Sequence, residues 1–201
     1  MEKNDLIDFL IKIEELTKSG LKYSTDPYAI DNYRQLEEQV KKLLEKDDIV
    51  LEGENLFTRD VYPTPNVSVR TVIFSEDRKS VLLVKERMDA LWSLPGGWAE
   101  MDLNPSESAK KEVYEEAGCD CVITRLVGVL DRYNDVKTTG VPEYVICFEA
   151  EKVGQFHEPC FEILERKYFP LDSLPKFSRK NREDQMRRLI KAALEGETVF
   201  D

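Results

Sequence analysis

The 201-residue sequence is poor in the residues that bind zinc. It has one histidine, His157, and four cysteines, none of them in a CxxC pair. Because zinc sites are built from closely spaced cysteines and histidines, a zinc site of ordinary spacing is not expected. Cys119, Cys121, Cys147 and Cys160 are therefore interpreted as reduced thiols of a cytoplasmic protein.

Basic residues are outnumbered by acidic ones, with 29 Lys and Arg against 40 Asp and Glu, a formal net charge of −11. Proteins that grip a nucleic-acid backbone usually carry a basic surface, so we expect no stable nucleic-acid partner. A small anionic substrate is still compatible, because a bound cation masks local negative charge. The sequence has no apolar run of membrane-spanning length and begins with acids rather than a basic signal segment, so no membrane association is expected.

The composition, 41% hydrophobic and 34% charged, is that of a globular protein with one core and a small appendage. Apolar spacing predicts an amphipathic helix over about residues 3–18, with Gly20 as its end. Asp26 and Pro27 then predict the N-cap and first turn of a second helix. Two helices alone make a poor core, so residues 1–62 are interpreted as a helical extension. It either completes the fold or serves as a dimerisation or substrate-capping arm, and a homodimer is expected.

From Val67 onward the pattern changes to strands and helices that interleave without a regular βαβ rhythm. We predict a hairpin, a short extended piece ending at Gly96 and Gly97, a helix, three more strands and a closing helix. The hairpin is predicted over residues 67–74 and 80–85, the extended piece over 92–97 and the helix over 105–117. The three later strands are predicted over 122–130, 144–151 and 162–169, and the closing helix over 179–195. This order favours an α/β (α+β) domain over residues 63–201, in which a mixed sheet lies between helices.

The predicted helix over residues 105–117 concentrates carboxylates. Glu112 and Glu116 are four residues apart and share a helix face, and Glu115 borders it. Such a pattern is also common on solvated surfaces. Here Gly96 lies one loop upstream, where a bare backbone can bring its carbonyl to a cation, and Mg²⁺ prefers hard oxygen ligands. Gly118 is a suitable C-cap for the helix.

At this point the residues resemble a known family. The segment from Gly97 to Cys119 is similar to the Nudix box, Gly-x5-Glu-x7-Arg-Glu-U-x-Glu-Glu-x-Gly-U, where U is aliphatic. The positions that match in register are Gly97, Glu112, Val113, Glu115, Glu116 and Gly118. Those that depart are Leu103 for the first glutamate, Lys111 for the arginine and Cys119 for the last aliphatic residue. In the family that glutamate commonly pairs with the arginine, so we predict Asp102 or Glu107 as a replacement partner for Lys111.

The resemblance extends beyond the box. Val69-Arg70, Leu82 to Val84 and Trp92 to Trp98 resemble the Nudix core, and Gly20 to Tyr28 resembles a branch with an N-terminal helical extension. That branch includes bacterial CDP-choline pyrophosphatase and proteins labelled ADP-ribose pyrophosphatases. The resemblance implies a Nudix fold and a Mg²⁺-dependent hydrolase, with Mn²⁺ as an alternative cation. Its implied substrates are small-molecule nucleotides, nucleoside diphosphates linked to a group X.

Within that class the extension favours CDP-choline as substrate, with ADP-ribose or an ADP-sugar as the alternative. Leu103 and Lys111 leave open a different class, a regulator that binds a nucleotide without turnover. A side activity on RNA ends is a further alternative, although the negative charge disfavours tight RNA binding.

The resemblance also implies residue roles. Glu112, Glu115, Glu116 and the Gly96 carbonyl would hold one to three divalent ions, and Glu115 and Glu116 would be catalytic. In several members the general base is a glutamate from a later loop, which favours Glu162 here over Glu158 and Glu165. The alternative is that Glu162 is an outward-facing strand residue. Arg70 near a strand end could hold a phosphate through its guanidinium, or be an ordinary surface charge.

Overall fold

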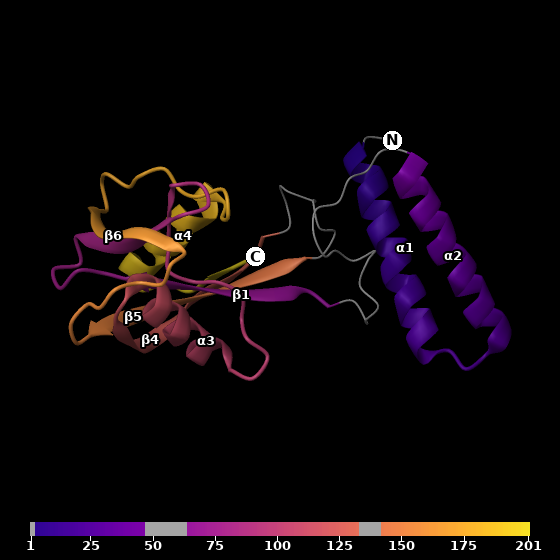
Figure 1. Cartoon of the computed structure of the whole chain (residues 1–201), viewed down its shortest axis with the longest axis horizontal. Coiled ribbons are helices and arrows are strands. Elements are labelled where there is room, and N and C mark those ends of the chain that lie inside the picture. Colours follow the sequence, from indigo (N-terminus) through magenta and orange to yellow (C-terminus); the bar gives the residue numbers. More distant parts are fainter. Residues whose placement is uncertain (1–2, 47–63, 133–141) are drawn as a thin grey trace. The chain divides into compact units, whose positions relative to one another are not determined.

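The computed structural model describes residues 3–46, 64–132 and 142–201 (Figure 1). By its internal contacts the chain divides into two units. One contains residues 1–66 with 133–142, and the other contains residues 67–132 with 143–201. The predicted boundary at residue 62 lies outside the described residues, so the extent of the extension stays a prediction.

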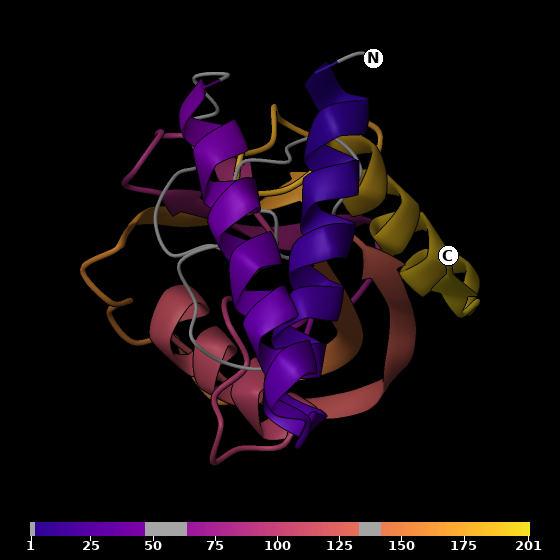
Figure 2. The same cartoon turned by 90° about the vertical axis from the view of Figure 1, so that its right-hand side faces the viewer.

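The first unit contains two antiparallel helices, α1 (Lys3–Tyr23) and α2 (Pro27–Lys46), which lie side by side in Figure 2. Ile7, Leu10 and Val40 are buried in one apolar cluster of this unit. Asp26 caps α2 as predicted, because its Oδ1 accepts the Tyr28 N–H at 3.1 Å. Neither of these helices, nor any other in the described part of the chain, is long and apolar enough to cross a membrane.

The predicted helix end at Gly20 is wrong. Helix α1 continues through Gly20 to Tyr23. A Cβ at Gly20 would collide with the ring of Tyr33 on α2, so this glycine allows the two helices to approach closely. The glycine therefore serves packing within the helix pair, and its low helix propensity was misleading as a stop signal.

The strands of the second unit form two sheets, one of four strands in the order β1-β5-β4-β7 and one of three in the order β3-β2-β6. The pairs β2–β3, β2–β6 and β4–β5 are antiparallel, and the pair β4–β7 is parallel. The elements are β1 (Asn66–Ile73), β2 (Ser80–Glu86), β3 (Trp92–Ser93), α3 (Pro105–Glu112), the π-helix η1 (Val113–Ala117), β4 (Asp120–Asp131), β5 (Glu143–Val153), β6 (Ile163–Pro170), α4 (Glu183–Glu195) and β7 (Val199–Phe200). The α/β class and the three later strands are confirmed as β4, β5 and β6.

The predicted hairpin between residues 67–74 and 80–85 is wrong beyond its turn. Phe74 and Val81 make a single antiparallel bridge, after which the two strands enter different sheets. β1 pairs with β5, and β2 pairs with β3 and β6. Both strands are buried on both faces over most of their length, so each lies between two packed layers and not in a half-exposed hairpin.

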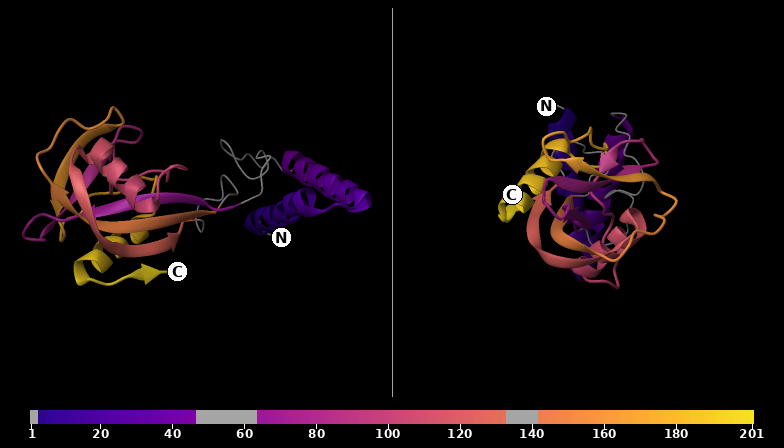
Figure 3. Two further views of the ribbon diagram at one scale, coloured as in Figure 1. Left: turned by 90° about the horizontal axis from the view of Figure 1, so that it is seen from below. Right: turned by 90° about the vertical axis from the view of Figure 1, so that its left-hand side faces the viewer.

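Side chains of β2 alternate between two apolar clusters. Val81 and Leu83 point into a cluster shared with α4, and Leu82 and Val84 into a cluster shared with Val113 of η1. Figure 3 shows the corresponding arrangement, with α4 and α3 on opposite sides of the strands. The strand layer is therefore held between helices as predicted, and the acidic helix is fixed to it from one side.

The acidic segment is one α-helix followed by one π-helical turn rather than a single α-helix over 105–117. Asn104 and Glu107 form a capping box at the start of α3. Val113 and Ala117 of η1 are fully buried. Gly118 ends the segment in the left-handed conformation, with φ 64°. Such π-helical turns often occur at functional sites.

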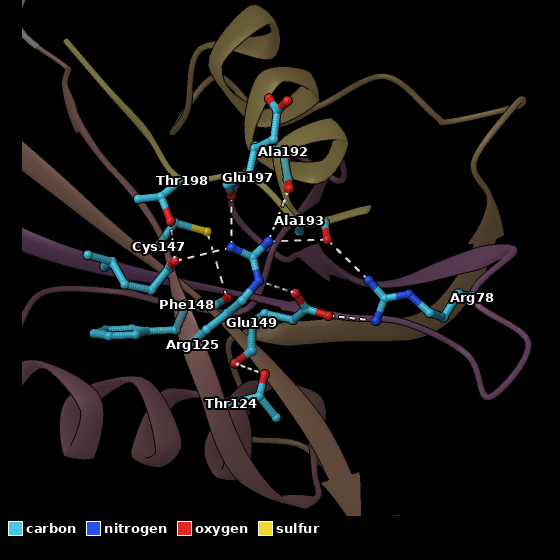
Figure 4. Close-up of polar contacts among 11 residues, drawn as sticks. Arg78, Thr124, Arg125, Cys147, Phe148, Glu149, Ala192, Ala193, Glu197 and Thr198 are labelled. Atoms are coloured by element: carbon cyan, nitrogen blue, oxygen red, sulfur yellow. Dashed lines mark hydrogen bonds and ion pairs between the residues drawn. The ribbon is translucent and has the colours of Figure 1, made fainter. Parts of the chain in front are cut away.

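Two arginines bind the C-terminal end of α4 (Figure 4). Arg125 Nη2 donates to the Ala192 carbonyl at 3.0 Å, and Arg78 Nη2 donates to the Ala193 carbonyl at 3.1 Å. Glu149, 8% exposed, accepts from both arginines, at 2.9 Å from Arg125 and 2.6 Å from Arg78. These carbonyls already accept the backbone N–H groups of Gly196 and Glu197, and the arginines add hydrogen bonds and positive charge at the negative end of the helix dipole. This network fixes α4 in place.

Replacement of Arg125 by Met is expected to lower the free energy of unfolding by about 3 kcal/mol, because it leaves helix carbonyls and the buried Glu149 with fewer partners. Chemical denaturation of the variant measures this change. Lys191→Gln removes a 73%-exposed charge 3.8 Å from Glu195 and is the matched control, with a change below about 0.5 kcal/mol. Equal changes in the two variants would show that the network contributes nothing.

Candidate active site

The site begins at the glycine corner, Pro95 to Gly97, which follows β3. Thr71 N–H donates to the Pro95 carbonyl and Val69 N–H to the Gly97 carbonyl, both at 2.9 Å. Gly96 has φ +148°, and a Cβ there would collide with the Val69 carbonyl oxygen. Only glycine satisfies both constraints. The two backbone hydrogen bonds thus hold the glycine corner against β1.

Glu116 is the buried carboxylate of the site, 3% exposed. Its Oε2 accepts the Gly96 N–H at 2.8 Å. Burial raises the pKa of Glu116 to about 8 despite that hydrogen bond, and the charges of Glu86 and Glu112 raise it further while Lys180 opposes them. A carboxylate kept this far from water and beside other acids favours a positive partner.

Glu112 lies against the second glycine of the corner. A Cβ at Gly97 would collide with Glu112 Oε1 and would lie 2.9 Å from its Cδ. Burial raises the pKa of Glu112, and the charge of Arg70 opposes the shift. The structure therefore brings Glu112 and Glu116 to adjacent glycines, in agreement with their predicted common face.

Glu115 points elsewhere. Its side chain is 43% exposed and pairs with Lys111 at 3.2 Å. Lys111 also pairs with Glu100 at 2.5 Å, and hydrogen bonds to Glu100 and Glu115 raise its pKa. The predicted partners Asp102 and Glu107 were wrong, because Glu107 is used in the capping box and Glu100 lies across the loop.

Arg70 is buried, 2% exposed, rather than a surface charge. Its Nε donates to Asn181 Oδ1 at 3.0 Å and its Nη1 donates to the Val69 carbonyl at 2.7 Å. Burial lowers its pKa, while the charges of Glu116 and Glu143 oppose the change. The guanidinium thus lies next to Gly96 of the glycine corner, near the carboxylates of Glu116 and Glu143. Its predicted contact with a phosphate stays a prediction.

Glu162 is exposed and lies in the turn before β6, not in the strand. Its carbonyl accepts the Arg87 N–H at 2.8 Å. Two residues earlier, Cys160 N–H donates to the Glu115 carbonyl at 2.6 Å, so the loop leading to Glu162 rests on η1. Glu165 is exposed on β6 opposite Lys85. The role of Glu162 as a base stays a prediction.

Within the described residues, no three His, Cys, Asp or Glu side chains are grouped as a metal site. The reason is local, since Glu115 turns to Lys111 while Glu112 and Glu116 face the corner. The donors nevertheless fit a hard divalent cation, because both facing groups are carboxylates. The ammonium of Lys180 lies near these carboxylates, with Nζ 4.0 Å from Glu116 Oε1. The Pro95 and Gly97 carbonyls are used by β1, so the Gly96 carbonyl is the corner's candidate ligand.

Sequence reasoning missed three residues of the site: Glu86, Lys180 and Asn181. Glu86 directly follows the predicted strand over 80–85 and looked like an ordinary strand end. Lys180 and Asn181 fell in the predicted helix over 179–195. That helix begins only at Glu183, because Asp89 holds the Ser178 hydroxyl at 2.7 Å and keeps the preceding residues in a loop. The run of polar residues after Phe177 was the sequence feature that could have indicated a loop before this helix.

Comparison with known proteins agrees with this fold. A family profile described as NUDIX domain matches residues 64–192. The Bacillus subtilis (strain 168) protein YjhB, which carries a provisional ADP-ribose pyrophosphatase name, is 33% identical over 208 residues, covering 94% of each chain. The chain belongs to the Nudix family, and it is a hydrolase of that family. Nudix hydrolases generally use a divalent metal ion and act on small-molecule substrates, nucleotides among them.

Two solved structures extend the comparison. One, described as an ADP-ribose pyrophosphatase from Streptococcus suis 89-1591, is 33% identical with a TM-score of 0.58 and covers 69% of this chain and 100% of its own. The other, described as a UDP-X diphosphatase, is 26% identical with a TM-score of 0.62 and covers 100% of both chains. The second similarity therefore includes the helical extension as well as the Nudix domain.

Proposed function

We propose that this Nudix hydrolase cleaves the pyrophosphate bond of a nucleoside diphosphate linked to a second group. The observation that carries the proposal is the placement of Glu116. It is buried, joined to the Gly96 N–H at 2.8 Å, and stands at the family's glutamate position. Glu112 beside Gly97 supplies a second carboxylate on the same side. Together they provide the negative charge that a divalent cation needs.

Under this proposal Glu112, Glu116 and the Gly96 carbonyl hold Mg²⁺, with Mn²⁺ as an alternative, and Glu115 joins them by leaving Lys111. The cation supplies positive charge against the pyrophosphate oxygens and makes a nearby water more acidic. The side-chain exchange needs little energy, because Glu115 and Lys111 form a solvent-exposed pair.

Glu162 takes a proton from the attacking water, whose oxygen forms a new bond to one phosphorus. The bond from that phosphorus to the bridging oxygen breaks, and the bridging oxygen leaves with the other phosphate. The exposure of Glu162 suits proton exchange with solvent, and the contact of its loop with η1 supports its nearness to the carboxylates. Arg70, next to the corner, orients Asn181 and offsets the carboxylate charge.

Among substrates, the comparisons favour ADP-ribose over CDP-choline, because two relatives at 33% identity carry ADP-ribose pyrophosphatase names. The full-length similarity to a UDP-X diphosphatase favours a UDP-linked compound as a second candidate. CDP-choline stays the prediction of the N-terminal resemblance. The helical extension is proposed as a dimerisation or substrate-capping arm, and light scattering on the intact protein tests the dimer.

A panel of ADP-ribose, UDP-sugars and CDP-choline, assayed with Mg²⁺ for kcat/KM, tests the proposal. We expect ADP-ribose to rank first, release of a nucleoside monophosphate, and loss of cleavage in Glu116→Gln but not in the exposed control Glu76→Gln. A severalfold preference for CDP-choline or a UDP-sugar would replace ADP-ribose as the substrate. Tight binding of one compound with no cleavage by the wild type would instead establish a nucleotide-binding regulator.

A further inference from the structure

A second buried carboxylate lies beside Glu116 and has no part in the chemistry proposed above. Glu86, at the end of β2, is 3% exposed. Its Oε1 accepts the Ser93 hydroxyl at 2.7 Å. The charge of Glu86 contributes to the raised pKa of Glu116, so the two carboxylates lie close enough to repel one another. Left without a positive partner, Glu86 would offer a divalent cation another hard oxygen ligand.

The partner of Glu86 is Lys180. Its Nζ lies 3.3 Å from Glu86 Oε1 and 3.2 Å from Oε2, and only 4.0 Å from Glu116 Oε1. The ammonium therefore bridges the two carboxylates, with the firmer contact to Glu86. The side chain of Lys180 is 29% exposed, which shows that the pair is reached by solvent from one side.

The loop that carries Lys180 is tied on both sides of it. Before it, the Ser178 hydroxyl donates to Asp89 at 2.7 Å, and the Ser178 N–H donates to the Trp92 carbonyl at 2.7 Å. After it, Asn181 accepts the Arg70 Nε at 3.0 Å. Lys180 is thus delivered to the carboxylates by a fixed backbone, unlike a solvated surface lysine whose ammonium is free to leave.

We infer that Lys180 is a positioning residue that keeps Glu86 out of the cation-binding set and leaves Glu116 for the cation. The inference rests on the proposed cation site at Glu112 and Glu116. It goes further because it assigns a role to Glu86 and Lys180. The ion pair between them determines how strongly the site binds its cation and which carboxylates are the ligands. Loss of the ammonium turns Glu86 into an extra ligand, which strengthens cation binding and misplaces the cation.

Mn²⁺ binding without substrate, followed by electron paramagnetic resonance, tests this inference. Lys180→Met is expected to bind Mn²⁺ about tenfold more tightly than the wild type, because it removes a competing positive charge and frees a carboxylate. At the same time its kcat should fall. Lys180→Arg keeps the charge and is expected to remain within about twofold of the wild-type affinity. The double variant Lys180→Met/Glu86→Gln should return towards wild type, since the freed carboxylate is gone.

Glu86→Gln provides an independent arm that does not depend on the folding of Lys180→Met. Here Lys180 loses its firmer partner and is left to Glu116, so Mn²⁺ affinity is expected to fall severalfold. Unchanged or weaker binding in Lys180→Met, or unchanged binding in Glu86→Gln, overturns the inference. A lower unfolding temperature with no change in affinity assigns the pair a structural role only.

The same titration separates this inference from the function on which it rests. Glu116→Gln is expected to lose Mn²⁺ binding. If it binds Mn²⁺ like the wild type, or if the wild type binds none, the proposed cation site fails and the role of Lys180 fails with it. If Glu116→Gln loses binding while both tests on the Glu86–Lys180 pair show no change, only the inference fails.

Discussion

Replacing Glu116 by Gln is expected to lower kcat/KM for pyrophosphate cleavage on the order of 10³-fold. Stabilisation of transition-state charge by a bound cation is worth several kcal/mol, and about 1.4 kcal/mol corresponds to tenfold in rate. Gln keeps the shape of the side chain and an oxygen for the Gly96 N–H, so the fold should persist. Steady-state kinetics with Mg²⁺ on the preferred nucleotide measures the loss.

The same variant is expected to be more stable than the wild type when divalent cations are removed. Burial raises the pKa of Glu116 to about 8 from an ordinary value of 4.5, so the folded state binds the proton more tightly than the unfolded state. This contribution is present below pH 4.5 and is lost as the pH rises towards 8. Glu116→Gln lacks this dependence and should gain on the order of 2 kcal/mol relative to the wild type above pH 8.

Thermal unfolding in the presence of a chelator, from pH 5 to 8.5, checks the stability prediction. The difference in Tm between Glu116→Gln and the wild type should widen as the pH increases. Addition of Mg²⁺ at high pH should close the difference by stabilising the wild type. Parallel Tm curves for the two proteins would refute the proposal that an ionised Glu116 is costly without its cation.

The second large effect is expected for Gly97→Ala. The φ angle of Gly97 is not positive, so alanine is compatible with the backbone there. Its Cβ, however, would occupy the place of Glu112 Oε1. We expect Glu112 to be displaced, with a fall in kcat/KM of about 10²-fold and weaker activation by Mg²⁺, because misplaced ligands lose geometry that the reaction needs. Activity as a function of Mg²⁺ concentration measures both changes.

A double-mutant cycle with Glu112→Gln identifies the cause. If alanine acts by moving the Glu112 carboxylate, adding Gly97→Ala to Glu112→Gln should cost little more activity. Full additivity of the two losses would show that Gly97→Ala damages the corner itself. Wild-type kinetics for Gly97→Ala alone would show that Glu112 has no part in the reaction.

Much of the site could be predicted from the sequence because its chemistry is local in the chain. The spacing of Glu112 and Glu116 already places both on one helix face, and the glycine corner lies one loop upstream. The same reasoning placed Glu115 at the border of that face and included it among the cation ligands. It did not predict the π turn η1, which has no simple sequence signature, nor the pairing of Glu115 with Lys111 and Glu100.

The residues that sequence reasoning missed are brought to the site by long-range contacts. Lys180 lies 94 positions from Glu86 and depends on where α4 begins. That beginning is set by Asp89, again far away in the chain. The hydrogen bond of Arg70 to Asn181 joins residues 111 positions apart and was not predicted. Periodicity and spacing carry no signal for such contacts.

The central claim is that Glu112 and Glu116, facing Gly96 and Gly97, hold the divalent cation that this Nudix hydrolase requires. The most direct measurement is a Mn²⁺ titration of the wild type, Glu112→Gln, Glu116→Gln and the exposed control Glu76→Gln, without substrate. The wild type and Glu76→Gln should show the same saturable binding, which is weakened in Glu112→Gln and lost in Glu116→Gln. Equal Mn²⁺ affinity in all four proteins would contradict the claim.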